Sequence, residues 1–137
     1  MRVIIDTNVV LDVLLARTRF VKSASRVFAL VEQSKIEASL CATTVTTVHY
    51  LLAQSLSRDE GRRALRRLLE LFEIAPVNRP VLEEALKSKI ADFEDAVVEQ
   101  AGRLAGAEAI ITRNTKDFRR SSIKALDPAE LLSAVEL

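Results

Sequence analysis

The sequence begins MRVIIDTN (residues 1–8), in which a short apolar run ends at an aspartate, Asp6. The segment AIITRNTKDF (residues 109–118) follows the same pattern, since its apolar run leads directly into Thr112, Asn114 and Asp117. Short apolar runs that end in polar residues are typical of strands buried on both faces of a parallel sheet. Both segments are therefore predicted to be buried strands that end in polar side chains.

Segments with apolar residues three and four positions apart separate the predicted strands, as in amphipathic helices. Strands are predicted at residues 3–5, 36–40, 73–77, 108–112 and 123–126. Helices are predicted at residues 8–15, 20–33, 58–72, 79–88 and 92–106. A further helix is predicted to begin with Thr43 or Thr44 as its cap and to run to about Ala53, and a last helix is predicted to follow the pair Asp127–Pro128. Strands that alternate with helices favour an α/β fold, here a three-layer α/β/α single domain over residues 1–137 with a mostly parallel, doubly wound sheet.

The composition sets limits on the class of protein. Of the 137 residues, 49% are hydrophobic and 28% are charged, and the net charge of +1 does not by itself indicate a nucleic-acid-binding protein. The single cysteine, Cys41, cannot form an internal disulfide, which favours a reducing, cytoplasmic location. No apolar run approaches the length of a membrane span and no signal peptide is evident, so a protein without membrane attachment is expected.

Acidic residues gather near the predicted strand ends. Asp6 follows the first strand, Asp117 follows a later strand, and Asp92, Glu94 and Asp95 open the helix between them. In open parallel sheets, sites form at the carboxyl ends of the strands, where the strand order reverses. Like charges brought together cost free energy unless a cation neutralises them, and clusters of carboxylates suit hard cations such as Mg²⁺ or Mn²⁺.

Each of these acids also has a purely structural interpretation. Asp6 can cap the helix that begins after it, and Asp92 can cap the helix over residues 92–106. Asp117 can be a solvated loop residue. The combination of positions therefore carries more weight than any one acid.

Three segments together resemble a known family. The segments are VIIDTNVVLD (residues 3–12), DFEDAVVEQAG (residues 92–102) and AIITRNTKDF (residues 109–118), and in this order they resemble the PIN domain family. The resemblance implies a Mg²⁺- or Mn²⁺-dependent endoribonuclease that cleaves RNA phosphodiester bonds. Many members are VapC-like toxins of bacterial and archaeal toxin–antitoxin pairs, so the resemblance also implies an antitoxin partner and, by analogy, a homodimer.

The resemblance assigns expected roles to individual residues. Asp6, Asp95 and Asp117 match the acids that bind the metal, and Asn114 stands where many members have another aspartate. The supporting positions are Thr112, which matches a hydroxyl near the metal, and Asn8, which matches an asparagine that shapes the first loop.

The sequence departs from the family pattern at one important position. The family usually has a glutamate in the helix after the second strand, and here Thr47 takes that place. The remaining acids suffice for one Mg²⁺ with several waters, so impaired catalysis is an open alternative. Because a helix turns about 100° per residue, Glu94 is expected to face away from Asp95, whereas Asp92 can lean toward the same side.

Basic residues flank the proposed acids. Their side chains are candidates to hold substrate phosphates, or they are ordinary solvated loop residues. The candidates are Arg113, Lys116, Arg119 and Arg120. A second basic stripe, formed by Arg58, Arg62 and Arg66 on the helix over residues 58–72, is expected to be an exposed helical face.

Two rival functions remain beside the ribonuclease. Thr47 and Asn114 favour a PIN-like module that binds RNA or a protein without cleaving. A phosphotransferase with Asp6 as its nucleophile is less favoured, because such enzymes generally need a second acid two residues later and Asn8 stands there.

Overall fold

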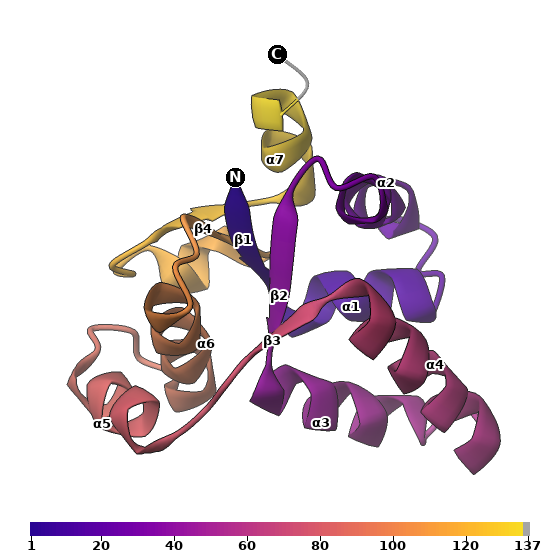
Figure 1. Ribbon diagram of the computed structural model, residues 1–137, viewed down its shortest axis with the longest axis horizontal. Coiled ribbons are helices and arrows are strands. Elements are labelled where there is room, and N and C mark those ends of the chain that lie inside the picture. Colours follow the sequence, from indigo (N-terminus) through magenta and orange to yellow (C-terminus); the bar gives the residue numbers. More distant parts are fainter. Residues whose placement is uncertain (136–137) are drawn as a thin grey trace.

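The computed structural model describes residues 1–135 and contains one five-stranded sheet (Figure 1). All its strand pairs are parallel, and the strand order is β3-β2-β1-β4-β5. The strands are β1 (Arg2–Ile5), β2 (Glu37–Cys41), β3 (Glu73–Ala75), β4 (Ala109–Ile111) and β5 (Lys124–Leu126). The α/β fold with a doubly wound parallel sheet, expected from the sequence, is confirmed.

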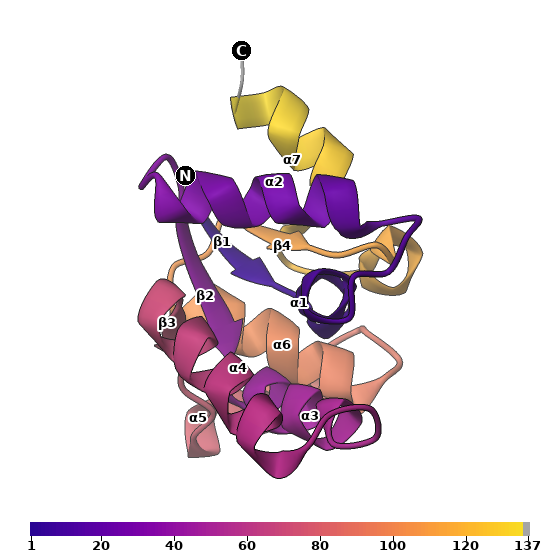
Figure 2. The same cartoon turned by 90° about the vertical axis from the view of Figure 1, so that its right-hand side faces the viewer.

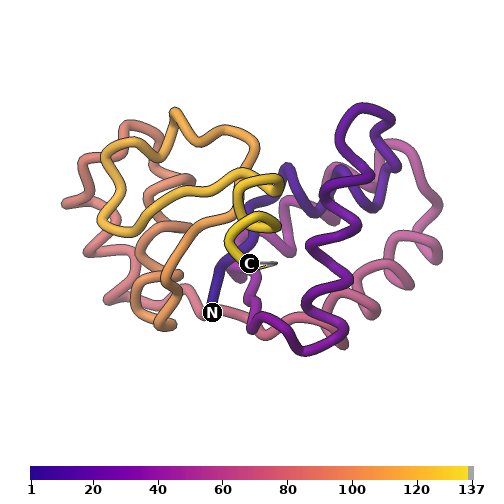
Figure 3. Tube along the Cα trace, turned by 90° about the horizontal axis from the view of Figure 1, so that it is seen from above, coloured from indigo at the N-terminus to yellow at the C-terminus, as the bar shows by residue number. Residues whose placement is uncertain are grey.

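Helices cover both faces of this sheet. They are α1 (Thr7–Leu14), α2 (Val21–Glu32), α3 (Ala42–Leu52), α4 (Arg58–Leu71), α5 (Arg79–Lys87), α6 (Phe93–Leu104) and α7 (Pro128–Val135). One hydrophobic cluster joins the sheet to α1, α2, α3, α4 and α7, and a second joins it to α5 and α6. Figures 2 and 3 show these two helical layers from other directions.

The buried strand β1 shows why the sequence folds in this way. Val3 and Ile5 point into the first cluster and Ile4 into the second, and all three are fully buried. Full burial of such a side chain contributes roughly 1.5–3 kcal/mol. Helix α6 packs so closely on β1 that a Cβ at Gly102 would lie 2.8 Å from Cγ2 of Ile4.

Some helix and strand ends differ from the prediction. β3 stops at Ala75, before Pro76, which cannot donate a hydrogen bond to a neighbouring strand. The predicted threonine cap of α3 is wrong, because this helix begins directly after Cys41 and has no side-chain cap. Asp127 does cap α7, since its Oδ1 accepts the backbone N–H of Glu130 at 2.8 Å. Asp117, for which a solvated loop position was one interpretation, lies in a short 3₁₀ helix, η1 (Thr115–Phe118).

The sheet reverses its strand order next to β1. The chain first adds β2 and β3 on one side of β1, and then adds β4 and β5 on the other. Ile5 pairs with Ile111, and the backbone N–H of Asp6 donates to the carbonyl oxygen of Ile111 at 2.9 Å. The polar residues after β1 and β4 therefore lie side by side, as the sequence predicted.

No helix within residues 1–135 is long and apolar enough to span a bilayer.

Candidate active site

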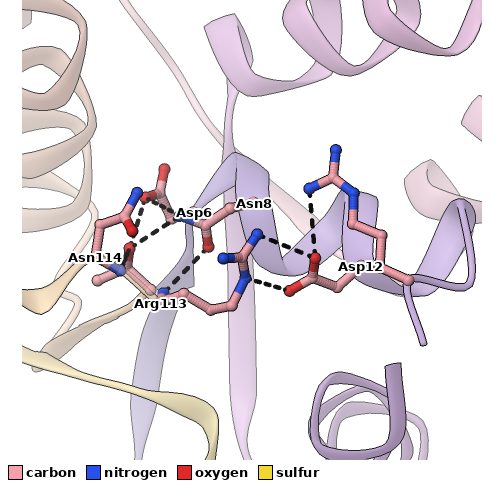
Figure 4. A network of polar contacts seen from close by, with 7 residues as sticks. Asp6, Asn8, Asp12, Arg113 and Asn114 are labelled. Carbon is pink, nitrogen blue, oxygen red and sulfur yellow. Dashed lines mark hydrogen bonds and ion pairs between the residues drawn. The ribbon is translucent and has the colours of Figure 1, made fainter. Parts of the chain in front are cut away.

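Asp6 lies at the carboxyl end of β1, beside the point where the strand order reverses. Its side chain is mostly buried, with 7% exposure, and its Oδ1 accepts the backbone N–H of Thr7 at 2.8 Å. Its Oδ2 accepts the hydroxyl of Thr112 at 2.8 Å and the side-chain amide of Asn8 at 3.4 Å (Figure 4). Asp6 therefore caps α1 and also lines a cleft, so the structural and functional interpretations of this residue are compatible.

Asn8 and Thr112 join the start of α1 to the loop after β4. The amide of Asn8 also donates to Oγ1 of Thr112 at 3.3 Å, while its Oδ1 accepts the backbone N–H of Arg113 at 3.2 Å. Oγ1 of Thr112 accepts the backbone N–H of Asn114 at 3.0 Å. These bonds fix the backbone of Asn114, and this residue lines the same cleft as Asp6.

The first turn of α6 presents two acids to the same region. Asp92 caps the helix, because its Oδ1 accepts the backbone N–H of Asp95 at 3.0 Å. Glu94 and Asp95 both line the cleft that contains Asp6, and the hydroxyl of Thr47 on α3 donates to Oε1 of Glu94 at 3.2 Å. The expectation that Glu94 faces away is therefore wrong. Side chains in a first helical turn lean toward the N-terminus, and this helix end faces the cleft.

Two neighbouring clefts contain the proposed site residues. The acidic cleft has a volume of about 240 Å³, and its polar walls include Asp6, Asn8, Arg17, Thr47, Glu94, Asp95 and Asn114. The basic cleft has a volume of about 600 Å³, and its walls include Lys89, Asp92, Asp95, Lys116, Asp117, Arg119 and Arg120. Because Asp95 lines both, the structure brings Asp95 together with Asp6 on one side and with Asp117 on the other.

The acids influence one another electrostatically. Burial is the largest influence on the pKa of Asp6 and raises it, the hydrogen bonds from Thr112 and Thr7 lower it, and the charges of Asp117 and Glu94 raise it again, so that the pKa lies above its ordinary value. Burial also raises the pKa of Asp95, and the charges of nearby acids bring it to about 7; in order of effect these acids are Asp6, Asp92, Asp117 and Glu94. Within the described part of the chain, no lysine or arginine forms an ion pair with Asp6, Glu94, Asp95 or Asp117.

The donor atoms suit a hydrated ion better than a cage of protein ligands. Among residues 1–135, no three acidic, histidine or cysteine side chains lie close enough together to surround one ion. Mg²⁺, however, usually keeps several waters and binds through only one or two carboxylates, which Asp6 and Asp95 offer. The oxygen-only donor set therefore fits a partly hydrated Mg²⁺ or Mn²⁺.

The four basic candidates separate into two groups. Arg113 is held by the fully buried Asp12, with Nε 2.7 Å from Oδ2, and its guanidinium stacks 3.9 Å from the ring centre of Phe20. This placement differs from the prediction of a phosphate contact, because the buried ion pair occupies the side chain. Lys116, Arg119 and Arg120 line the basic cleft.

The structure adds functional candidates that the sequence did not indicate. Lys89 lines the basic cleft from the loop before α6, and its position three residues before Asp92 was the available signal. Arg17 lines the acidic cleft from the turn after α1, and no local pattern points to it. Asp12 on α1 is the last residue of the first motif, but its pairing with Arg113 depends on residues far apart in the sequence.

Comparison with known proteins identifies the fold and the family. The structure of VapBC2 from Rickettsia felis, bound to a DNA fragment from its promoter, matches with a TM-score of 0.72 at 13% identity, covering 93% of this chain and 98% of the other. VapBC-1 from nontypeable Haemophilus influenzae matches with a TM-score of 0.70 at 19% identity and coverage of 94% and 99%. A toxin–antitoxin complex from Klebsiella pneumoniae matches with a TM-score of 0.70 at 22% identity and coverage of 92% and 97%.

No curated protein sequence matches this chain significantly. The model of the PIN domain, however, matches residues 2–116, which include both strand ends and the first turn of α6. The chain therefore belongs to the PIN domain family.

Proposed function

We propose that this protein is a divalent-cation-dependent endoribonuclease. The observation that carries the proposal is the convergence of Asp6, Glu94 and Asp95 on one cleft, with Asp117 in electrostatic reach and with no ion pair from any lysine or arginine of residues 1–135 to these acids. Such an arrangement costs free energy in the isolated protein. A divalent cation is the simplest partner that offsets this cost, and membership in the PIN family supports a nuclease.

Asp6 and Asp95 are the residues that would hold Mg²⁺ or Mn²⁺ directly, and Asp117, which lines the neighbouring cleft, would reach the ion through water. Such an ion, when bound, lowers the pKa of a coordinated water and stabilises charge on a phosphoryl group. Glu94 adds a fourth carboxylate to this region, which offsets the absence of an acid at Thr47. The side chain of Asn114 lines the cleft, where an amide can orient a water or a substrate oxygen.

The protein's own residues would also position the substrate. Lys116, Arg119 and Arg120 line the basic cleft next to Asp95, where they would bind backbone phosphates of RNA. The hydroxyl of Thr112 holds Oδ2 of Asp6 in place, so it would orient this carboxylate toward the reacting groups. The residues that would bind phosphate and the acids that would hold the ion therefore line two neighbouring clefts that share Asp95.

A toxin role is part of the proposal. The structural relatives include toxin–antitoxin complexes, and a protein antitoxin that covered the two clefts would block access to the acids. A cytoplasmic location and a homodimer remain predictions from the sequence.

The decisive experiment is a cleavage assay on a fluorescent single-stranded RNA with Mn²⁺, with Mg²⁺ and with EDTA, beside a DNA strand of the same sequence. We expect cleavage of the RNA with either ion, none in EDTA, and a loss of at least about 10²-fold in Asp6→Asn, the scale of removing one key stabilising group. The matched control is Asp59→Asn, which removes the same charge from an exposed position on α4. Preferential cleavage of DNA would contradict the RNA assignment.

The alternative is a module that binds RNA without cutting it. Thr47 on the cleft wall and the neutral Asn114 favour this alternative, as does the absence of a three-ligand cluster within residues 1–135. RNA binding that is equal in EDTA and Mn²⁺, unchanged by Asp6→Asn and never followed by cleavage would establish it.

A further inference from the structure

The acidic cleft contains a cation that the proposed chemistry does not yet use. Within the described residues, Arg17 is the one basic side chain among those that line this cleft. We infer that Arg17 binds a phosphate of the substrate strand on the side of Asp95 away from the basic cleft. The inference rests on the proposed function and adds a substrate-positioning residue to it.

The first argument is the charge balance around Asp12. This carboxylate is fully buried and faces two guanidinium groups, so one negative charge meets two positive charges. Arg113 binds it through Nε at 2.7 Å and Nη2 at 3.3 Å, whereas Arg17 reaches it only through Nη1 at 3.4 Å. Arg113 therefore supplies the main neutralising charge, and the positive charge of Arg17 is left in surplus.

The second argument is that the backbone of Arg17 is fixed while its side chain is partly free. Its N–H donates to the carbonyl oxygen of Asp12 at 3.1 Å, and its own carbonyl accepts N–H groups from Phe20 and Val21 at 2.9 and 2.8 Å. Ala16, with a φ of +47°, adopts the left-handed conformation that turns the chain into this position. The side chain of Arg17 is 40% exposed, so a held backbone carries a partly accessible basic side chain that lines the cleft.

The third argument is the arrangement of charge along the two clefts. Asp95 lines both of them, with Arg17 in one and Lys116, Arg119 and Arg120 in the other. Cations therefore flank the acids on two sides. A single strand that crosses Asp95 would place phosphates on both groups of cations at once, as in grooves that follow a nucleic-acid backbone.

The competing role for Arg17 is structural, as a second counter-ion for Asp12. That role predicts a loss of stability in Arg17→Gln and no change in RNA affinity. Phosphate binding predicts weaker RNA binding with little change in stability, because the stronger pair between Arg113 and Asp12 remains in the variant. The two roles can therefore be separated in one set of variants.

The test measures binding of a fluorescent single-stranded RNA in EDTA across a salt series, so that cleavage does not interfere. Loss of one phosphate contact should lower the slope of log K against log salt by about 0.7, which is roughly fourfold in Kd at about 0.15 M salt. We expect this result for Arg17→Gln, a Kd within about twofold of wild type for Arg17→Lys, and no change for the control Lys22→Gln. Lys22 is exposed on α2 and lines neither cleft.

A second readout separates failure of the inference from failure of the proposed function. With Mn²⁺, Arg17→Gln should raise KM about fourfold with little change in kcat, because phosphate binding acts equally before and during the reaction. A wild type that cleaves RNA, beside an Arg17→Gln variant with unchanged Kd, salt slope and KM, would overturn the role of Arg17 alone. A wild type that neither binds nor cleaves RNA would overturn both.

Discussion

Two aspartates on helices, Asp12 on α1 and Asp95 on α6, have opposite surroundings. Asp12 is completely buried and faces two arginines, so its charge is compensated within the fold. Asp95 is half-buried and faces Asp6, Asp92, Asp117 and Glu94, which together with burial raise its pKa to about 7. The contrast shows that a buried acid inside the fold is paired with arginines, whereas the acids that line the cleft are not. Acids left without a counter-charge are therefore the best markers of function here.

Glu99 extends the comparison to a buried acid that forms no ion pair within residues 1–135. It is only 2% exposed, and it accepts hydrogen bonds from the hydroxyl of Ser88 at 2.6 Å, the N–H of Ser122 at 2.6 Å and the amide of Gln100 at 2.8 Å. Burial acts to raise its pKa, but these hydrogen bonds outweigh burial and hold the pKa below its ordinary value. Hydrogen bonds can therefore satisfy a buried carboxylate that has no ion pair.

The largest effect on stability is expected from Asp12→Ala. This change leaves Arg113 and Arg17 without their shared partner, and breaking a buried ion pair costs about 3–5 kcal/mol. Urea denaturation should show this loss, while Asp59→Ala on the surface of α4 should change the stability by less than about 0.5 kcal/mol. Equal stability of the two variants would mean that the ion pairs of Asp12 do not stabilise the fold, and the contrast with the acids of the cleft would then fail.

A smaller loss of folding stability, about 1–3 kcal/mol at neutral pH, is expected for Glu99→Gln, because an amide cannot accept all the hydrogen bonds that the carboxylate accepts. The pKa of Glu99 is lowered in the fold, so its ionised form stabilises the protein above its ordinary pKa of 4.5. This contribution is lost as the pH falls through the lowered value. Thermal melts from pH 7 to pH 3 should therefore converge for wild type and variant. A constant difference in Tm at every pH would contradict this account.

In contrast to the two variants above, Asp95→Asn is expected to increase the stability of the protein. The pKa of Asp95 is raised from 3.8 to about 7, so its ionisation costs stability as the pH rises between these values and costs nothing below them. After allowance for solvent screening of this half-buried group, the variant should gain up to about 1 kcal/mol at pH 8, or roughly 2–4 °C in Tm. Near pH 4 the two proteins should melt together.

Added Mn²⁺ supplies the matching control for Asp95→Asn. The ion should raise the Tm of the wild type and close the gap at pH 8, because ligand binding stabilises the state that binds it. A wild type that is as stable as the variant in EDTA at pH 8 would remove the contrast between Asp12 and Asp95.

The smallest effect is expected for Thr47→Glu, which adds an acid opposite Glu94. In EDTA the added like charge should cost about 0.2–1 kcal/mol, the range for exposed charge interactions. With Mn²⁺ the variant should bind the ion more tightly than wild type by calorimetry. Glu94→Gln should weaken binding, and the double variant should restore it. Failure of Thr47→Glu to rescue Glu94→Gln would show that the two positions do not serve the same ion.

The sequence predicted the strands and the meeting of the residues after β1 and β4 because both depend on local patterns and on general rules for parallel sheets. Glu94 was misplaced because a rotation of 100° per residue does not describe the end of a helix, where side chains extend past the first turn. The ion pair between Arg113 and Asp12 joins residues 101 positions apart, and no local pattern encodes such a pairing. The 3₁₀ turn of η1 likewise accompanies the burial of Phe118 in the second hydrophobic cluster, whose members come from distant parts of the sequence.

The hydrogen bond between Thr112 and Asp6 has a consequence for the synthesis of this protein. The two residues are 106 positions apart, so a growing chain must extend by more than 100 residues beyond Asp6 before β4 can pair with β1. Asp6 and Asp117 cannot come together until Asp117 itself has left the ribosome. A fragment that ends before β4 therefore lacks Thr112 and Asp117, and it would hold Asp6 without the hydrogen bond and the neighbouring acid that complete the site.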